Sequence, residues 1–306
     1  MNQIIFATIL FLTQPLFAKS DFNYLSIGVR QPSLELVFDN QGSDQESELR
    51  EVTFAPQIPT IVVLGTSYKH IGLSVSMDTD QSEDAADYVD YRTSLLFERF
   101  GFFAGYTEFE RFKIVETTGF SAPPEGDLLK RSSMAARFIS MDLAYFPISI
   151  NYSLEHSLEF HKIKKWGLGL GVMASYAQTD FATPNGLVPQ AMQEAFGPDG
   201  KMEAGSFATS GVRLVLGLTL APGPLYFSTL FGAGRGNQSF HYETADETRE
   251  GEGHSDIMSM RINFGYAGKA GFVGFLLEQL SPNYILKFMS IETASTDIAV
   301  NCGINL

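Results

Sequence analysis

Strict alternation of apolar and polar residues is the feature that most limits what this chain can fold into. Between Ile148 and His161, apolar residues occupy every even position except His156, and polar residues occupy every odd position. A period of two places successive side chains on opposite faces of a β-strand. We therefore predict a strand over 148–161, longer than the roughly 9–11 residues that a tilted strand needs to cross a membrane.

The same alternation recurs at 71–78, 166–172, 212–220, 258–266 and 298–306. One face of these segments carries Leu, Ile, Val, Met and Phe, and the other carries Gly, Ser and Asn with isolated charges. A soluble β-sandwich also alternates, but its polar face meets bulk water and is normally more charged. Small polar residues suit a confined lumen, and the apolar face suits lipid. The pattern favours a transmembrane antiparallel up-and-down β-barrel over a secreted sandwich.

Turns and loops indicate how many strands the barrel has. Short turns at 68–70, 221–224 and 267–269 alternate with longer polar segments at about 40–58, 79–90, 114–134, 179–206 and 237–256. Outer-membrane barrels have short turns on one side and long loops on the other. We expect about 14 strands, within about 12–16, including separate strands at 22–30 and 33–38. The up-and-down order fails at 162–206, which would put that segment on the short-turn side or inside the lumen.

One short helix is predicted near 189–196. Pro189 suits the first helical position, and Gly197 followed by Pro198 ends the helix. Its apolar residues fall on one side: Val188, Met192 and Phe196. The helix either packs on a loop or plugs the lumen.

Residues 1–18 have the composition of a secretory signal peptide. They carry no charge, are apolar from Ile4 to Phe17, and end at Ala18, a small residue suited to cleavage. The alternative is an uncleaved membrane anchor. Residues 19–306 then form a single barrel domain, and export followed by insertion predicts the bacterial outer membrane.

Composition excludes several classes of function. The net charge of −14 disfavours nucleic-acid binding, because phosphates would be repelled. A single cysteine, Cys302, excludes an intrachain disulfide and a cysteine-cluster metal site. We expect no cofactor. The 28 Gly and 26 Phe residues are instead placed by the alternation, with Phe on the lipid side and Gly mainly on the other.

Three segments resemble a known family. They are the stretch 60–77 around Tyr68-Lys69-His70, the Tyr145-Phe146 pair leading into 151–154, and the Lys-rich link before the glycine strand that starts at Trp166. Together they resemble an uncharacterised domain-of-unknown-function family of exported bacterial β-barrel-like proteins. The link at 161–165 departs from that family's pattern. The resemblance implies an outer-membrane barrel and no particular activity.

Charged residues on the polar face are the candidate site. They are Arg92, Glu98, Asp142, Glu155, Glu159, Arg213, Arg261, Lys287 and Asp297. Mixed charges on a lumen face either tune a water-filled pore or cross-link a closed one. In a narrow lumen we expect these charges to be paired, because an unpaired charge is costly to bury.

His156 is a weak catalytic candidate, because a His on the lipid side of a strand could activate a serine from a neighbouring strand. We favour the simpler interpretation, a His at the edge of the lipid belt. Two acidic groups are expected in loops and are candidate sites for divalent cations, although they lack the spacing of an EF-hand. The groups are Asp78, Asp80, Glu83, Asp84, Asp87 and Asp90, and Glu243, Asp246, Glu247, Glu250, Glu252 and Asp256.

The leading functional hypothesis is a small-solute channel or a structural, surface-exposed barrel. The alternatives are a barrel enzyme acting on membrane lipids and a transporter of hydrophobic ligands. Expected partners are outer-membrane lipids and the machinery that inserts barrels, with no nucleic acid.

Overall fold

The computed structural model describes residues 22–39, 50–56, 61–78, 87–120, 130–158, 166–183, 186–244, 246–268, 270–281, 283–285 and 290–305. Most of these residues lie in one sheet of 14 strands. The strands are β1 (Phe22–Asp39), β2 (Glu51–Pro56), β3 (Ile61–Tyr68), β4 (Ile71–Asp78), β5 (Tyr88–Leu96), β6 (Phe100–Thr118), β7 (Lys130–Ile150), β8 (Gly167–Ala182), β9 (Met202–Leu220), β10 (Leu225–Thr244), β11 (Thr248–Ala267), β12 (Gly271–Ser281), β13 (Asn283–Ile285) and β14 (Ser290–Asn305). The predicted signal peptide lies outside the described residues.

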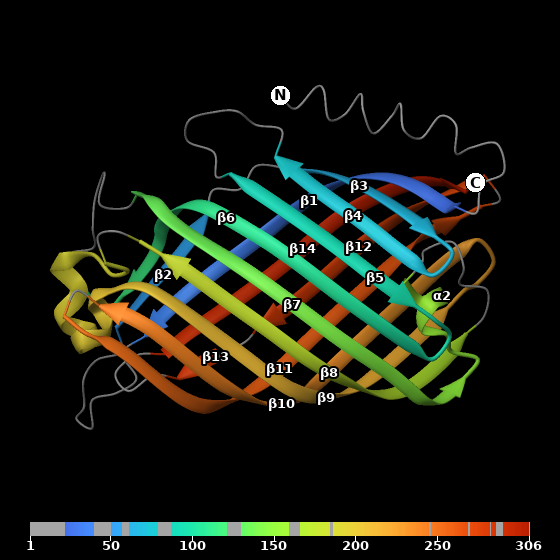
Figure 1. Ribbon diagram of the computed structural model, residues 1–306. Helices are drawn as coiled ribbons and strands as arrows, with labels where there is room; N and C mark the ends of the chain where they lie inside the picture. The colour runs from blue at the N-terminus through green and yellow to red at the C-terminus, as the bar shows by residue number, and fades with distance from the viewer. Residues whose placement is uncertain are drawn as a thin grey trace.

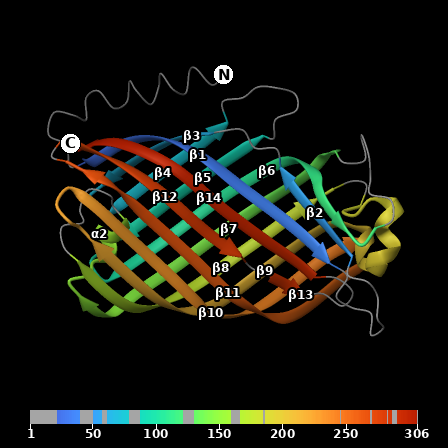
Figure 2. The ribbon, with the colours of Figure 1, turned by 180° about the vertical axis from the view of Figure 1, so that it is seen from behind.

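The sheet closes on itself as an antiparallel barrel. Consecutive strands pair from β3 to β12, and β12 then pairs with β14. The first and last strands complete the ring through an unbroken ladder from Tyr24↔Asn305 to Asp39↔Ser290. Twelve of the 14 strands form this ring, whose tilted wall is visible from both sides in Figures 1 and 2. The predicted up-and-down barrel is confirmed, and the ring is two strands smaller than the total that alternation suggests.

Two short strands, β2 and β13, stand outside the ring. β2 bridges β1 and β6, pairing with Leu36–Asp39 on one side and with Phe112–Thr118 on the other. Toward this end of the barrel, β3, β4 and β5 have ended, and β2 alone fills the gap between β1 and β6. The wall therefore has fewer strands here, and the barrel narrows. We call this narrow end the loop end. The opposite end, with the tight turns at 69–70, 97–99 and 221–224, is the turn end.

The strand predicted over 148–161 is wrong. β7 ends at Ile150, Asn151 has a left-handed φ of 53°, and a five-residue helix, α2 (Leu154–Leu158), follows. Leu154 and Leu158 are four residues apart, so they fit one face of a helix as well as one face of a strand. With α2 in this place, β7 pairs directly with β8, and the up-and-down order is regular through 130–220.

Two other boundaries differ from the prediction. The strands expected at 22–30 and 33–38 are one strand, β1. The loop expected at 237–256 is the outer part of the β10–β11 hairpin, which stays paired out to Glu243↔Thr248. The strands continue here, but their outward face meets water and carries polar side chains. The sequence therefore no longer alternates between apolar and polar residues.

The predicted helix near 189–196 is present and longer. It is the 3-10 helix η3 (Gln190–Lys201), which begins after Pro189 and is interrupted at Gly197, where φ is 57°. Neither α2 nor η3, nor any other helix in the described part of the chain, is long and apolar enough to cross a membrane.

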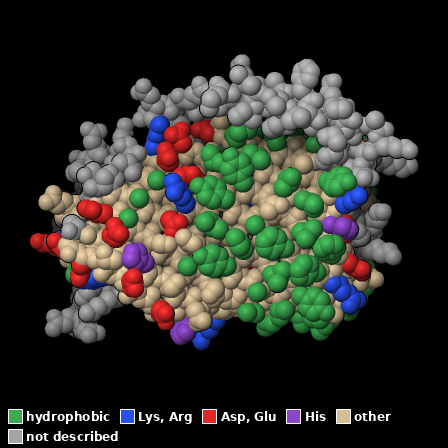
Figure 3. Space-filling model, in the orientation of Figure 1, with side chains coloured by type: hydrophobic (Ala, Val, Ile, Leu, Met, Phe, Trp, Pro, Cys, Tyr) green, Lys and Arg blue, Asp and Glu red, His purple; other side chains and the backbone are tan. Residues whose placement is uncertain are grey.

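Outward side chains form an apolar belt toward the turn end. Leu73, Leu143, Leu214 and Val300 lie on this face, and Leu214 is 67% exposed. Exposed aromatic side chains lie near the turns, as in the interfacial girdles of membrane barrels: Tyr68, Tyr145, Trp166 and Tyr266. Figure 3 shows hydrophobic side chains gathered over this half of one face, with most acidic side chains toward the other end. An apolar surface this extensive suits lipid.

The belt makes a testable prediction. Leu214→Arg should destabilise the barrel in phospholipid vesicles by about 2–4 kcal/mol, because it places a charge in the hydrocarbon layer. Urea unfolding followed by the fluorescence of Trp166, the only tryptophan, measures the change. Ser239→Arg, on the exposed outer part of β10, is the matched control and should change stability by less than about 0.5 kcal/mol. Equal losses in the two variants would contradict a lipid-facing belt.

Candidate functional site

An apolar core fills the lumen at the loop end. Inward side chains of several strands meet there, and Leu36, Phe38, Phe54 and Phe207 are each at most 1% exposed. The apolar side of the η3 segment joins the same core through Val188, Met192 and Phe196. η3 therefore covers the loop end of the lumen, with its apolar side on this core (Figure 1). The narrowing produced by β2 brings the side chains of the wall close enough to meet those of the η3 segment.

A buried carboxylate anchors η3 to the neighbouring hairpin. Asp199, whose side chain is fully buried, accepts hydrogen bonds of 2.7 Å from the Tyr242 hydroxyl and 2.7 Å from Arg249 Nη1. Hydrogen bonds that involve a charged group are stronger than neutral ones. The cap at the loop end is thus fixed to β10 and β11 by polar contacts as well as by its apolar face.

The segment after β7 packs inside the wall at the turn end. Tyr152, Leu154 and Leu158 are buried against Phe146 and Val215 inside the wall. We call residues 152–158 the inner plug. Its first helical residue, Leu154, donates its backbone N–H to the carbonyl of Glu98 in the β5–β6 turn, at 2.8 Å.

Polar contacts within the inner plug hold its shape. The hydroxyls of Tyr152 and Ser157 lie 3.0 Å apart, and Ser157 also donates to the Leu154 carbonyl at 2.8 Å. Burial raises the pKa of Tyr152 to about 12, so its hydroxyl keeps its proton at neutral pH.

Inward glycines of β8 and β9 make room for the inner plug. A Cβ atom built on Gly169 or Gly217 would overlap the ring of Tyr152, and one on Gly171 would crowd Phe146. The alternating glycines of this wall therefore form a recess that the Tyr152 ring fills. The inward-facing glycines that the alternation predicted thus accommodate the inner plug.

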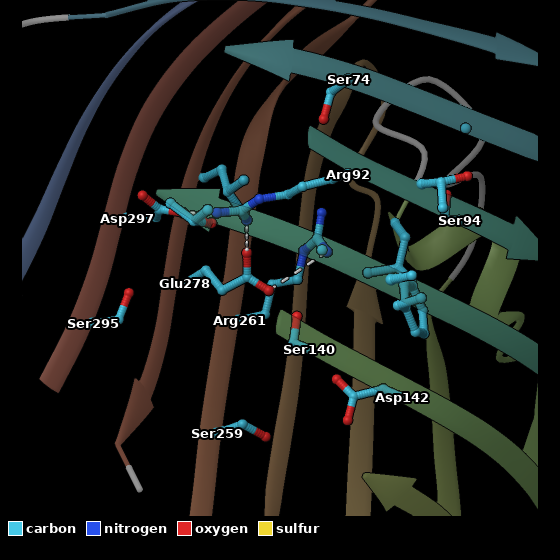
Figure 4. A pocket seen from close by; sticks show the side chains of 18 of the residues that line it. Ser74, Arg92, Ser94, Ser140, Asp142, Ser259, Arg261, Glu278, Ser295 and Asp297 are labelled. Atoms are coloured by element: carbon cyan, nitrogen blue, oxygen red, sulfur yellow. Dashed lines mark hydrogen bonds and ion pairs between the residues drawn. The ribbon is translucent and has the colours of Figure 1, made fainter. Parts of the chain in front are cut away.

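A cavity of about 310 Å³, lined by both apolar and polar side chains, lies between the apolar core at the loop end and the inner plug. We call it the chamber. Its lining is rich in serine hydroxyls and in charged side chains from opposite parts of the wall, several of which are labelled in Figure 4. Cavities of this size are at the lower limit of typical small-molecule sites.

Arg92 is the centre of the charge network on one side of the chamber. Its Nε lies 3.0 Å from Asp90 Oδ1, and its Nη1 lies 2.6 Å from Glu278 Oε2. Its Nη2 donates to Asp297. Arg30 adds a second contact to Asp90, with 2.7 Å between Nη1 and Oδ2. The network joins β1, β5, β12 and β14 across the lumen.

Two further arginines line other parts of the chamber wall. Arg213, 2% exposed, donates from Nη2 to Asp142 Oδ1 at 2.5 Å and to Ser175 Oγ at 2.7 Å. Arg261 is held more loosely, because its Nη1 lies 3.9 Å from Glu278 Oε1. Figure 4 shows Arg92 and Arg261 both directed toward Glu278.

The candidate residues from the sequence do not all meet. The structure brings together Arg92, Asp142, Arg213, Arg261 and Asp297 around the chamber. Glu98 instead lies exposed in the β5–β6 turn. Glu155 lies on α2, with 3.6 Å between its Oε1 and His70 Nδ1. Glu159 and Lys287 lie outside the described residues.

Three members of the network, Arg30, Asp90 and Glu278, were missing from the sequence-based set. Arg30 alternates with the lipid-facing Ile27 and Val29, and Glu278 has the inward parity of β12, so extending the alternation would have found both. Asp90 was assigned to an acidic loop. That assignment is wrong, because β5 begins at Tyr88 and carries Asp90 into the lumen, fully buried.

His156 does not lie on a strand. It belongs to α2, and its side chain is outside the described part of the structure. The premise of a His on the lipid side of a long strand is therefore wrong. Ser157, its neighbour, is buried and bonded to Tyr152.

The acidic loops show no cation site among the described residues. In the second group, Asp246, Glu250 and Asp256 lie 3.3, 3.1 and 3.0 Å from Lys201, His241 and Arg235. Asp80, Glu83 and Asp84 of the first group are outside the described residues. Divalent-cation binding at these loops stays a prediction.

Comparison with known proteins gives distant structural matches only. No protein-family model matches the sequence, and no curated protein matches it, so the resemblance to a domain-of-unknown-function family is not confirmed. The outer membrane protease OmpT from Escherichia coli is 9% identical, with 94% of this chain and 97% of that chain covered and a TM-score of 0.42. An outer membrane channel from Pseudomonas putida F1 is 8% identical, covering 92% and 96%, with a TM-score of 0.36. The toluene transporter TodX from P. putida is 9% identical, covering 95% and 92%, with a TM-score of 0.29. Similarity this low assigns no activity and no ligand to this chain.

The charge network can be tested by removing its centre. Arg92→Met should destabilise the barrel by about 3–5 kcal/mol, because it leaves buried carboxylates without their partner. The urea midpoint in detergent micelles measures the loss. Arg137→Met is the matched control, since Arg137 pairs with Glu108 at 2.8 Å on the outer surface, where ion pairs contribute little. A loss for Arg137→Met as large as that for Arg92→Met would show that the lumen network is not a stabilising element.

Proposed function

We propose that the protein is an outer-membrane β-barrel with a sealed lumen, which acts through its wall and outer surface rather than as an open pore. The apolar core at the loop end carries this proposal. Side chains of that core are buried and include those of η3, which is itself anchored through Asp199. A solute would have to disrupt a packed core to pass.

The closed wall and its apolar belt support insertion in a membrane. A barrel leaves no unpaired strand edge, and antiparallel barrels of this kind with an aromatic girdle belong to outer membranes. On this proposal residues 1–18 are a signal peptide removed on export, lipids contact the belt, and barrel-insertion machinery assembles the protein. The loop end then faces the outside of the cell and the turn end faces the periplasm.

A gated small-solute channel is the second candidate. The chamber favours it, because a barrel with a purely structural role has no need of a cavity of about 310 Å³ in its lumen. For the chamber to conduct, both the inner plug and the apolar core at the loop end would have to move.

The remaining alternatives have less support. A hydrophobic ligand would have to displace water from Arg92, Glu278 and Asp142 without replacing its hydrogen bonds, which is costly. A lipid-modifying enzyme built on His156 required this residue to lie on a strand, but it lies on α2.

The sealed lumen predicts electrical silence. Purified protein inserted into planar phospholipid bilayers should show no conductance steps over a range of voltages and salt concentrations. A shift in gel mobility between heated and unheated samples verifies that the inserted protein is folded. Reproducible steps from the folded protein would overturn the sealed barrel and favour the channel.

Opening one end separates the two candidates. Replacing residues 152–158 by a Gly-Ser segment of the same length removes the inner plug and leaves the core at the loop end. The sealed barrel predicts that this variant also stays silent, because the second closure remains. The gated channel predicts steps in the variant that are more frequent than in the unaltered protein, because only the core at the loop end then has to move.

A further inference from the structure

Small residues keep the chamber open in a repeated way. Serine hydroxyls face glycines on the next strand in the cross-strand pairs Ser26↔Gly65, Gly72↔Ser94 and Gly105↔Ser140. A Cβ atom on each of these glycines would lie between 2.5 and 2.9 Å from the serine oxygen. Ser259 faces Gly232 in the same manner. Larger side chains at these positions would fill the chamber. The small volume of serine and glycine therefore keeps it open.

Some hydrogen-bonding groups lie behind the chamber surface without a partner in the described part of the chain. Buried Arg30 Nε, Arg213 Nε, Arg261 Nε and Tyr88 OH have no hydrogen-bond partner among the described residues. All four can donate. The side chains of Arg30, Arg213 and Tyr88 are at most 5% exposed. These donors have almost no accessible surface, so a ligand cannot reach them. The charged groups that do present surface to the chamber include Arg92, Asp142 and Glu278, whose side chains are 28–33% exposed.

The charges of the wall exclude two classes of ligand. Among the described residues, each of the four arginines of the chamber faces a carboxylate of its own: Arg30 faces Asp90, Arg92 faces Asp297, Arg213 faces Asp142, and Arg261 faces Glu278. No full positive charge is left to compensate an anion, and no full negative charge is left for a cation. An apolar molecule would leave the ion pairs and serines without solvent or partners.

We propose that the chamber binds a small neutral molecule rich in hydroxyl groups, such as a monosaccharide or a polyol. Hydroxyl oxygens of the ligand accept from Arg92 and from the serine hydroxyls of the lining, and its hydroxyl protons are donated to carboxylates. Asp142 and Glu278 suit this second role, because their side chains are 28% and 33% exposed. Phe103, which also lines the chamber, offers a face for the C–H groups of a sugar ring.

The turn end is the route by which this ligand enters. The inner plug borders the chamber through Leu158, whereas the loop end is blocked by the larger core. Entry therefore requires movement of residues 152–158 only. This inference goes beyond the sealed barrel and does not depend on it, because binding from the periplasmic side needs no passage across the membrane.

Isothermal titration calorimetry on the full-length barrel in detergent tests the ligand class. D-Glucose is the neutral probe, and sodium gluconate, with the same carbon chain and a carboxylate, is the charged probe. We expect saturable binding of glucose, at least tenfold tighter than that of gluconate. Tighter binding of gluconate, or no glucose binding by either the unaltered protein or the form with residues 152–158 replaced, would overturn the proposal.

A chamber-filling variant locates the site. Ser140→Leu should weaken glucose binding at least tenfold, and Ser210→Leu, the same change on the exposed outer side of β9, should leave it unchanged. Unchanged binding in a folded Ser140→Leu barrel would place the site elsewhere and overturn the assignment.

If Ser140→Leu does not fold, Ser259→Leu on another part of the wall takes its place, and the glucose–gluconate comparison on the unaltered protein stands by itself. Conductance by the unaltered protein together with glucose preference would reject the sealed barrel and keep this site.

Discussion

Backbone hydrogen bonding between the two ends of the chain is the interaction on which the rest of the structure depends. Within a hydrocarbon layer every N–H and C=O must find a partner inside the protein, and a sheet can satisfy this only by closing. The ladder between β1 and β14, from Tyr24 to Asp39, supplies that closure. It brings together segments more than 250 residues apart in the chain and fixes the ring at 12 strands.

The width of the ring then dictates how the lumen is built. About eight strands can be filled by side chains, whereas 16–18 leave an aqueous channel. A ring between these limits needs additional material, and this chain supplies it at both ends. At the loop end β2 narrows the wall so that aromatic side chains and η3 meet, and at the turn end the inner plug enters the glycine recess. Between them, paired charges from facing strands hold a polar layer in which an isolated charge would be costly.

Much of this architecture was readable from the sequence. Alternation identified the barrel, the lipid-facing side of most strands and five of the charged residues that meet at the chamber. It failed at 148–161, because Leu154 and Leu158 satisfy the periods of a strand and of a helix equally well. Asp90 was misassigned for a related reason. Its acidic neighbours suggested a loop, and only the pairing of β5 with β4 and β6 carries it into the lumen.

The sequence by itself determined the class of fold, because the period of two is a local property that each strand expresses without reference to the others. It also determined which side chains face lipid, since a slip of one residue would expose polar groups to the hydrocarbon layer. Only the tertiary structure decided what occupies the lumen. The partners of Arg92 come from strands near residues 278 and 297, and the ring of Tyr152 fits glycines of two other strands. Such contacts depend on which strands face each other after the barrel closes. The local pattern of residues along one strand carries no information about that.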